Sequence, residues 1–173
     1  MSKYSNRMIL IHWLTLIVLV AAWFLGDVVH DARHEGAATL GGYLIHAVVG
    51  AAVLLLTIAR LMFRGKDGVP APIGNTPMDK VAKGIQHLIY LVLILLPVSG
   101  TMQVLTSDVG SALMAGDAAL LPAKFEGVVA HEVHEVLVNV LIVLVLVHVL
   151  GALKHQFVMK DNIMDRMSLR NKK

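Results

Sequence analysis

The chain has 173 residues, of which 57% are hydrophobic, with a mean hydropathy of +0.72 and a formal net charge of +3. Soluble domains are typically about 45–50% apolar, so this composition indicates a membrane protein without a second, soluble domain. The absence of cysteine excludes disulfides, thiolate metal sites, cysteine-ligated iron–sulfur clusters and covalent haem attachment through a C-x-x-C-H motif. The positive charge fits basic membrane flanks, and no stretch resembles a nucleic-acid-binding patch.

The first predicted span covers residues 8–29 and follows a short basic start with Lys3 and Arg7. A cleaved signal peptide has a similar beginning, but this apolar run is longer than a typical signal core and no A-x-A cleavage site follows it. We therefore predict an uncleaved transmembrane helix. A second span is predicted over residues 40–63, and Arg60 lies near its end.

Residues 65–83 are rich in Pro, Gly and Lys, a composition typical of a connecting loop. The third predicted span, residues 84–106, contains Pro97 and Gly100, which we expect to kink the helix. Packed neighbours tolerate such a kink in a membrane helix. A moderately acidic loop follows, and the fourth span is predicted over residues 131–157.

The basic residues are distributed unevenly among the segments that flank these spans. Thirteen of the fifteen lie in the N-terminal segment, the 60–83 connection and the C-terminal tail, and only Arg33 and Lys124 fall in the other two loops. Lys and Arg concentrate on the cytoplasmic side of a membrane protein. We predict one domain over residues 1–173, an all-α four-helix transmembrane bundle with both termini in the cytoplasm.

Nine histidines are many for so apolar a chain. His134 and His148 are fourteen residues apart, so they share a helix face and are separated by about 21 Å along its axis. His155 follows seven residues later on the same face, about 10 Å further on. Ionisable side chains inside a membrane are costly and usually functional. The pattern therefore predicts two cofactor sites stacked across the bilayer.

The outer layer of this arrangement contains His46, early in the second span, and His134, early in the fourth. A b-type haem in a helix bundle needs two axial ligands that project inward from separate helices, and histidine is a standard ligand. We predict an outer haem held by His46 and His134, with His131 one turn away as a rival. Small residues such as Gly50 and Gly100 would let a flat macrocycle approach the helices.

The inner layer contains His148, late in the fourth span, as the predicted ligand of a second haem b. Its partner is His12 or His87, which lie early in the first and third spans. Arg60 would pair with a propionate of the inner haem. The alternative is that Arg60 and the basic tail are only inside-positive membrane anchors.

Short motifs follow one another along nearly the whole chain. They are I-H-W-L at 11–14, I-H at 45–46, A-R-L at 59–61, H-x-x-Y at 87–90, P-V-x-G at 97–100, H-E-x-L-x-N at 134–139, His148, and K-D-N-x-x-x-R-M at 160–167. Each is weak alone, but together they make the chain similar to the bacterial cytochrome b561 family of small di-haem membrane cytochromes. One departure is Lys154, where similar proteins can have a second histidine.

The resemblance implies an assignment of the ligands. The related membrane cytochromes of formate dehydrogenases and hydrogenases ligate haem through helices one, two and four. By this resemblance the outer haem is held by His46 and His134, and the inner haem by His12 and His148. The protein is then expected to be a multi-pass protein of the bacterial inner membrane.

The resemblance also implies electron transfer between an outer one-electron donor and ubiquinone, most concretely a superoxide:ubiquinone oxidoreductase activity. His87 and His155 are candidates for quinone binding, because imidazole can hydrogen-bond a quinone carbonyl and deliver a proton. Lys160 and Asp161 would line a proton path, or they belong to a solvated tail. Acidic side chains crowd the outer side, which disfavours an anionic substrate unless local cations such as Arg33 offset them.

Two other functions remain open at this point. The chain would act as a non-catalytic membrane electron-transfer subunit if it serves a separate redox partner. Alternatively, the histidine layers would conduct metal ions in a transition-metal transporter. An absorption spectrum separates the transporter from the cytochromes, because reduced bis-histidine haem has sharp bands.

Overall fold

The computed structural model describes residues 2–72 and 74–169, and within them every regular element is helical. The elements are α1 (Asn6–His34), α2 (Leu40–Asp67), α3 (Pro77–Thr106), α4 (Asp108–Ala115), η1 (Ala118–Leu120), α5 (Val129–Leu153), η2 (Lys154–Met159) and η3 (Ile163–Met167). Four segments are long and apolar enough to cross a membrane, namely α1, α2, α3, and α5 together with η2. The predicted all-α fold with four spans is therefore confirmed.

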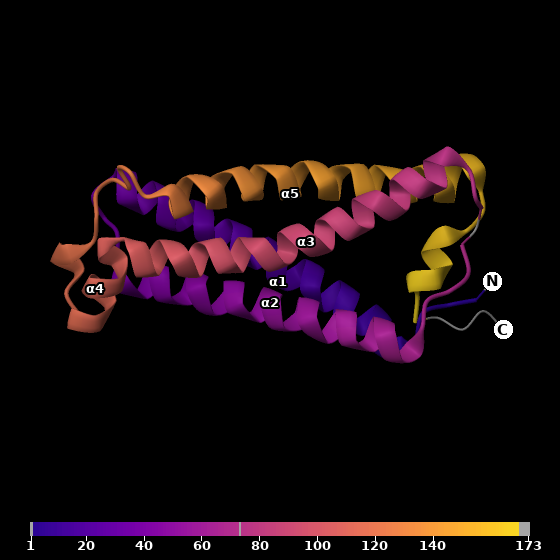
Figure 1. Ribbon diagram of the computed structural model, residues 1–173, viewed down its shortest axis with the longest axis horizontal. Helices are drawn as coiled ribbons and strands as arrows, with labels where there is room; N and C mark the ends of the chain where they lie inside the picture. The colour runs from indigo at the N-terminus through magenta and orange to yellow at the C-terminus, as the bar shows by residue number, and fades with distance from the viewer. Residues whose placement is uncertain (1, 73, 170–173) are drawn as a thin grey trace.

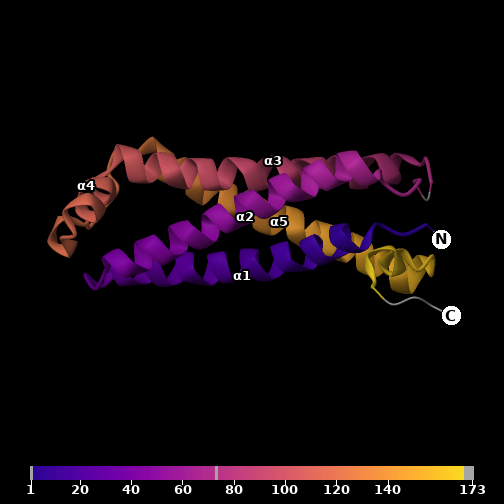
Figure 2. The ribbon, with the colours of Figure 1, turned by 90° about the horizontal axis from the view of Figure 1, so that it is seen from below.

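The four spans run along the length of the molecule, with α4 at one end and both termini at the other (Figures 1 and 2). Most of their side chains face away from the bundle. In the most apolar part of the fourth span, only 6% of the residues are buried inside the protein. Because lipid tails are as apolar as a protein core, this outward apolar surface is the one expected of a bilayer-embedded protein.

Hydroxyl side chains cap the first three long helices. Ser5, Thr39 and Thr76 precede α1, α2 and α3, and each accepts a hydrogen bond from a main-chain amide in the first turn. Asp79 completes a capping box with Thr76. Because of this cap, α3 begins at Pro77, seven residues before the predicted span.

The bundle is built from two closely packed helix pairs, α1 with α2 and α3 with α5. The first pair meets the second through α2 and α3, whereas the backbone of α5 approaches α1 and α2 at few points. The gap between α5 and the first pair is therefore wider than the gap between the two helices of either pair. Figure 1 also shows α3 changing direction along its course, as expected for a helix that contains Pro97.

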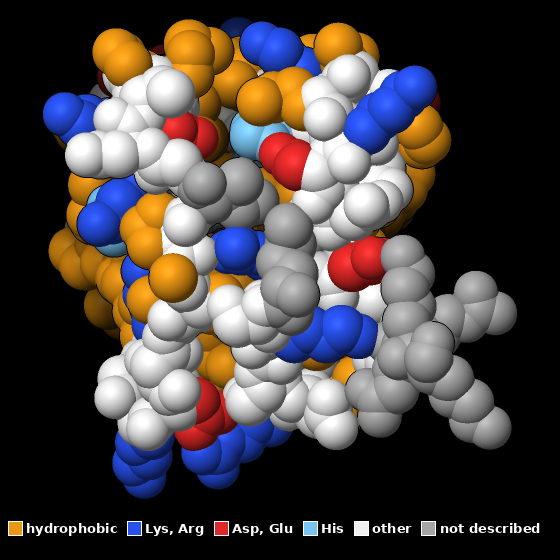
Figure 3. Space-filling model, turned by 90° about the vertical axis from the view of Figure 1, so that its right-hand side faces the viewer, with side chains coloured by type: hydrophobic (Ala, Val, Ile, Leu, Met, Phe, Trp, Pro, Cys, Tyr) orange, Lys and Arg blue, Asp and Glu red, His pale blue; other side chains and the backbone are white. Residues whose placement is uncertain are grey.

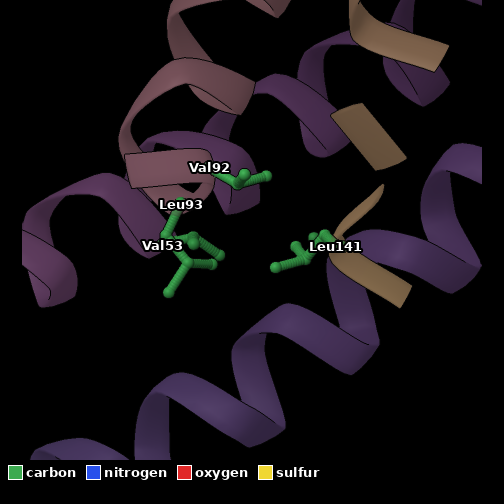
Figure 4. Close-up of a cluster of buried hydrophobic side chains, with 5 residues drawn as sticks. Val53, Val92, Leu93 and Leu141 are labelled. Carbon is green, nitrogen blue, oxygen red and sulfur yellow. The ribbon is translucent and has the colours of Figure 1, made fainter. Parts of the chain in front are cut away.

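A cluster of buried side chains fills the middle of the bundle and draws on all four spans. Its members are Ala22, Val53, Val92, Leu93 and Leu141. Figure 4 shows Val53, Val92 and Leu93 close together, with Leu141 pointing toward them from α5. The cluster separates the two ends of the interior.

The connection after α3 contains α4 and η1, whereas the sequence predicted an irregular loop there. The hydroxyl of Ser107 caps α4, and Gly116 ends it with a φ of 67°. Val109 of α4 is buried and packs with Phe125 and Tyr43. This segment therefore closes the end of the bundle opposite the termini.

The other end carries both termini, and Lys and Arg side chains gather in several patches on it (Figure 3). Arg7 and Asp67 form an ion pair that joins the ends of α1 and α2. The tail folds back across this end, since the amide of Tyr4 donates to the carbonyl of Arg166 at 3.2 Å. Arg166 in turn donates to the carbonyl of Ala71 at 2.8 Å. The described part of the tail is thus held against the bundle.

We expect Leu141→Ala to destabilise the bundle by about 2 kcal/mol or more, because removing a buried leucine leaves a cavity. Leu141 is 5% exposed, and Leu146 on the same helix is 57% exposed. The matched variant Leu146→Ala should change the melting temperature little. Thermal unfolding of the protein in detergent measures both variants, and equal losses would contradict the assignment of Leu141 to the core.

Candidate functional site

The structure brings four of the predicted ligands together as two facing pairs of histidines. His46 of α2 faces His134 of α5, with ring centres 6.3 Å apart and ring planes at 79°. His12 of α1 faces His148 of α5, with ring centres 6.4 Å apart and planes at 73°. All four side chains are partly buried. Each pair spans the wide interior between α5 and the first helix pair.

The separation of the rings fits two imidazoles that share one metal ion. With metal–nitrogen bonds of about 2 Å, rings on opposite sides of one ion have centres roughly 6 Å apart. Within the described residues, no group of three or more His, Cys, Asp or Glu side chains is arranged to hold a metal. A metal held by either pair would therefore take its other ligands from outside the protein. Haem meets this requirement, because its macrocycle leaves two axial positions for side chains.

The ring of His134 is oriented by α3. Its Nδ1 lies 3.0 Å from the carbonyl oxygen of Leu96 and 3.0 Å from the hydroxyl of the buried Ser99. A carbonyl can only accept a hydrogen bond, so Nδ1 carries the hydrogen and Nε2 is left for a metal. Pro97 lies in the same turn and lacks an amide hydrogen, which loosens the helix where the ring is bound.

Two glycines allow the outer rings to lie against neighbouring helices. A Cβ atom at Gly100 of α3 would lie 3.2 Å from Cε1 of His134, and one at Gly26 of α1 would lie 3.0 Å from Cε1 of His46. The Nδ1 of His46 is buried without a hydrogen-bond partner among the described residues. Both outer histidines thus rest on a glycine of the adjacent helix.

Gly50 and Gly26 stand differently toward the expectation drawn from the sequence, because only Gly50 was part of it. Gly50 was predicted to admit a macrocycle, and a Cβ atom there would meet nothing within 4 Å, so the space beside it is open. Gly26 was not among the predicted residues. Its signal in the sequence is its position fourteen residues after His12, the same spacing as between His134 and His148.

Residues seven apart connect the two pairs along the helices, because two turns return a side chain to nearly the same face. On α5 the series is His134, Leu141 and His148, and on α2 it is His46, Val53 and Arg60. The middle member of each series belongs to the buried cluster. Apolar packing therefore lies between the two pairs.

Arg60 lies at the level of the inner pair. Its Nε donates a hydrogen bond to the hydroxyl of Tyr90 at 2.7 Å, and its guanidinium lies 5.8 Å from the centre of that ring. Arg60 is also within electrostatic reach of His12 and His148. Tyr90 was noted only as part of the H-x-x-Y motif, and the structure gives it a defined role in orienting Arg60.

The two rival ligands lie elsewhere. His131 directs its Nε2 to the carboxylate of Glu135 at 3.2 Å, and its ring packs on Phe125 with centres 4.4 Å apart. His87 is exposed on α3. The structure therefore pairs His134 rather than His131 with His46, and His12 rather than His87 with the ligand on α5.

The residues predicted for quinone binding, His87 and His155, and Lys160 of the predicted proton path come from different elements. His155 lies on η2 and contacts Asp161, whereas Lys160 is exposed and His87 is on α3. A hollow of about 510 Å³ opens at this end of the bundle and is lined by other residues, among them Trp13, Gln156 and Phe157.

Several features of this hollow suit an amphipathic ring. Trp13 and Phe157 supply aromatic surface, and the Oε1 atom of Gln156 is buried without a hydrogen-bond partner. Trp13 also packs edge-on against His12, with ring centres 5.2 Å apart. The hollow therefore adjoins the inner pair. Gln156 was not predicted, because an amide in an apolar stretch gives no distinctive pattern.

At the opposite end, Arg33 is only 8% exposed. Its guanidinium lies 5.0 Å from the centre of the Phe125 ring and donates to the carbonyl of Ala123 at 3.5 Å. Ring nitrogens of His30 and His34 lie 3.5 and 3.4 Å away. Within the described residues, no carboxylate lies within ion-pair distance of Arg33.

Four membrane spans with two facing histidine pairs are the arrangement expected of a membrane cytochrome. Comparison with known proteins agrees. The family model for prokaryotic cytochrome b561 matches residues 3–168. The chain therefore belongs to the prokaryotic cytochrome b561 family and is a membrane electron-transfer protein of the bacterial inner membrane that binds haem b.

Individual relatives match over nearly their full length. The chain is 34% identical to cytochrome b562 of Cereibacter sphaeroides over 168 residues, which cover 95% of this chain and 94% of that protein. It is 30% identical to the probable superoxide oxidase CybB of Yersinia pestis over 174 residues, or 95% of each chain. It is 24% identical to cytochrome b561 homolog 1 of Escherichia coli K12 over 180 residues, which cover 99% and 100%.

We expect Gly26→Ala to disturb the outer site, because the added Cβ would lie 3.0 Å from the ring of His46. Gly41→Ala on α2 is the matched control, since a Cβ there meets nothing within 4 Å. The optical and electron paramagnetic resonance spectra of the oxidised protein should change for one haem in Gly26→Ala and for none in Gly41→Ala. Identical spectra for both variants would show that the contact at Gly26 is unimportant.

Proposed function

We propose that this protein is a two-haem superoxide:ubiquinone oxidoreductase with both termini in the cytoplasm. Superoxide would lose one electron on the outer side and leave as dioxygen. Ubiquinone would take up two electrons and two protons on the inner side, so two superoxide anions are consumed for each quinol formed. The observation that carries this proposal is the presence of two equivalent histidine pairs at opposite ends of one membrane bundle.

The residues that we propose to bind haem are the two facing histidine pairs. We assign His46 and His134 to the outer haem, and His12 and His148 to the inner haem. Haem bound at these positions supplies one-electron redox chemistry, because its iron cycles between two oxidation states. The hydrogen bond from Nδ1 of His134 to the carbonyl of Leu96 keeps this ring in a single tautomer.

Two further residues contribute to these sites. A Cβ at Gly50 would meet nothing within 4 Å, so this position would let the outer macrocycle approach α2. Arg60, oriented by Tyr90, offers a guanidinium to a propionate of the inner haem. An arginine suits this role because its planar group pairs with a carboxylate through two hydrogen bonds.

The identity of the donor is supported by a relative and by local charge. The relative is the probable superoxide oxidase of Yersinia pestis, which is 30% identical. An anionic donor requires positive charge near its point of arrival, although acidic residues predominate in the outer loops. Arg33 provides such a charge, because no carboxylate among the described residues neutralises it.

The acceptor is proposed from the hollow beside the inner pair. Trp13 and Phe157 would pack on the ring of a quinone, and the amide of Gln156 would hydrogen-bond one of its carbonyl groups. Because the hollow lies at the membrane boundary, the hydrophobic tail of a bound quinone would remain in the lipid. His155 lies on the same helical turn as Gln156, which keeps it as a candidate for proton transfer.

The purified protein should contain two haems per chain and should be reduced rapidly by superoxide. His46→Ala should retain one haem and lose rapid reduction, because the outer ligand pair is broken. His131→Ala, in the same layer but outside the pair, should retain both haems and the reaction. Haem-to-protein ratios and stopped-flow absorption spectra measure these outcomes.

The same measurements discriminate between the other functions. Two haems without reduction by superoxide would remove the enzyme activity and favour an electron-transfer cytochrome that serves a separate redox partner. His12→Ala should likewise leave a single haem, whereas His87→Ala should leave two. If His12→Ala retained two haems and His87→Ala retained only one, His87 rather than His12 would be assigned as the ligand of the inner haem.

A further inference from the structure

An unusual turn follows α5 at the inner end of the bundle. The helix continues into η2, a π-helical turn of six residues. Lys160 and Asn162 then have φ values of 54° and 56°, and among the described residues they are the two non-glycine residues with positive φ. Residues with a side chain rarely adopt this conformation, and π-helical turns and strained backbone both occur frequently at functional sites. Asp161 lies between the two strained residues.

The turn directs Asp161 at His155. The Oδ2 atom of Asp161 lies 2.5 Å from the Nδ1 atom of His155, and its Oδ1 atom accepts the amide of Ile163 at 3.1 Å. The amide of Asp161 donates to the carbonyl of His155 at 3.3 Å. Both carboxylate oxygens and the amide are therefore engaged, and the side chains of the pair are only 20% and 18% exposed.

The following segment anchors this turn. The indole of Trp13 on α1 donates to the carbonyl of Met167 at 3.0 Å, and the amide of Asp165 donates to the carbonyl of Asn162 at 3.0 Å. The strained conformation is thus maintained by contacts on both sides. Strain that is held in this way indicates that the position of Asp161 matters.

A histidine whose Nδ1 faces a carboxylate has a defined chemistry. The carboxylate accepts the Nδ1 hydrogen and fixes the tautomer, which leaves Nε2 to bind or release a proton. The carboxylate of Asp79, near the start of α3, also lies within electrostatic reach of His155. The His155 ring therefore lies near carboxylates from two segments, with Lys154 and Lys160 adjacent to the pair in the sequence. Such a group exchanges protons between water and a nearby reactant.

We propose that Asp161 is a positioning residue that holds His155 as the proton-transfer group for the acceptor reduced at the inner end. This inference rests on the proposed function and adds the source of its protons. A quinone becomes a quinol when it gains two electrons and two protons. The electrons come from the reduced protein. For each electron, His155, which precedes Gln156 of the hollow, releases one proton from Nε2 toward the quinone and regains one from water on the inner side.

The matched variants are Asp161→Asn, which keeps the shape but removes the charge, and Asn162→Gly, which keeps the positive φ. The holoprotein is reduced chemically, without superoxide, and then mixed with a short-chain ubiquinone analogue. In Asp161→Asn, kcat should fall at least tenfold with little change in KM, and the solvent isotope effect on kcat should increase. Asn162→Gly should behave like the unmodified protein.

A second readout does not depend on turnover. Nitrogen-15 spectra of histidine-labelled holoprotein, with the His155 signal assigned by its loss in His155→Gln, should show this ring protonated at Nδ1 and should show a mixture of its tautomers in Asp161→Asn. Asp161→Glu restores the carboxylate and should recover most of the rate. If it does, the loss in Asp161→Asn is caused by the missing charge rather than by misfolding.

The outcomes separate this proposal from the proposed function. An unchanged kcat and an unchanged tautomer in Asp161→Asn would overturn the role of the pair, as would a lost kcat that Asp161→Glu does not restore. If the wild-type protein is not reduced by superoxide but passes chemically supplied electrons to the quinone, only the proposal that superoxide is the electron donor is overturned. In that case the comparison of the Asp161 variants would still apply.

Discussion

The pairing of imidazoles across the interior is the constraint on which the rest of this structure depends. A histidine in a membrane helix needs a partner for its polar atoms, because lipid supplies none. His134 finds such partners at Nδ1 in the carbonyl of Leu96 and the hydroxyl of Ser99 on α3, and its ring also faces His46 across the gap to α2. His148 faces His12 of α1 across the same gap. The bundle is therefore two closely packed helix pairs, separated far enough for two rings to face each other at each end.

The seven-residue step explains how one sequence builds two similar sites. On α1 the step passes through His12, Leu19 and Gly26, so a ring of the inner pair and a support of the outer pair lie on one face. The neighbouring α2 runs in the opposite direction, and its series starts from His46 of the outer pair. Each helix thus contributes a histidine to one pair, an apolar side chain at mid-depth, and a residue near the other pair. On α2 these are His46, Val53 and Arg60. The buried cluster at mid-depth follows from this register without any further pattern.

Much of the fold was predictable because a membrane limits the alternatives. Long apolar runs must be helices, and histidines at equal depth on different helices must fall into layers. The supports of the rings were harder to predict, since Gly26 acts through the close approach of His46 from another helix, which depends on packing. The sequence analysis also did not predict where some of the helices begin and end. The cap at Thr76 and the short α4 arise from local hydrogen bonds within segments whose composition resembles a loop.

The fourth span contributes one ring to each pair, whereas the first two spans contribute one ring to one pair each. A tilt or axial slide of α5 therefore moves one ring of each pair together, whereas a similar movement of α1 or α2 changes a single pair. The geometries of the two pairs are consequently coupled mechanically through α5. A lipid or partner protein that presses on this helix would shift both pairs at once without contacting either of them.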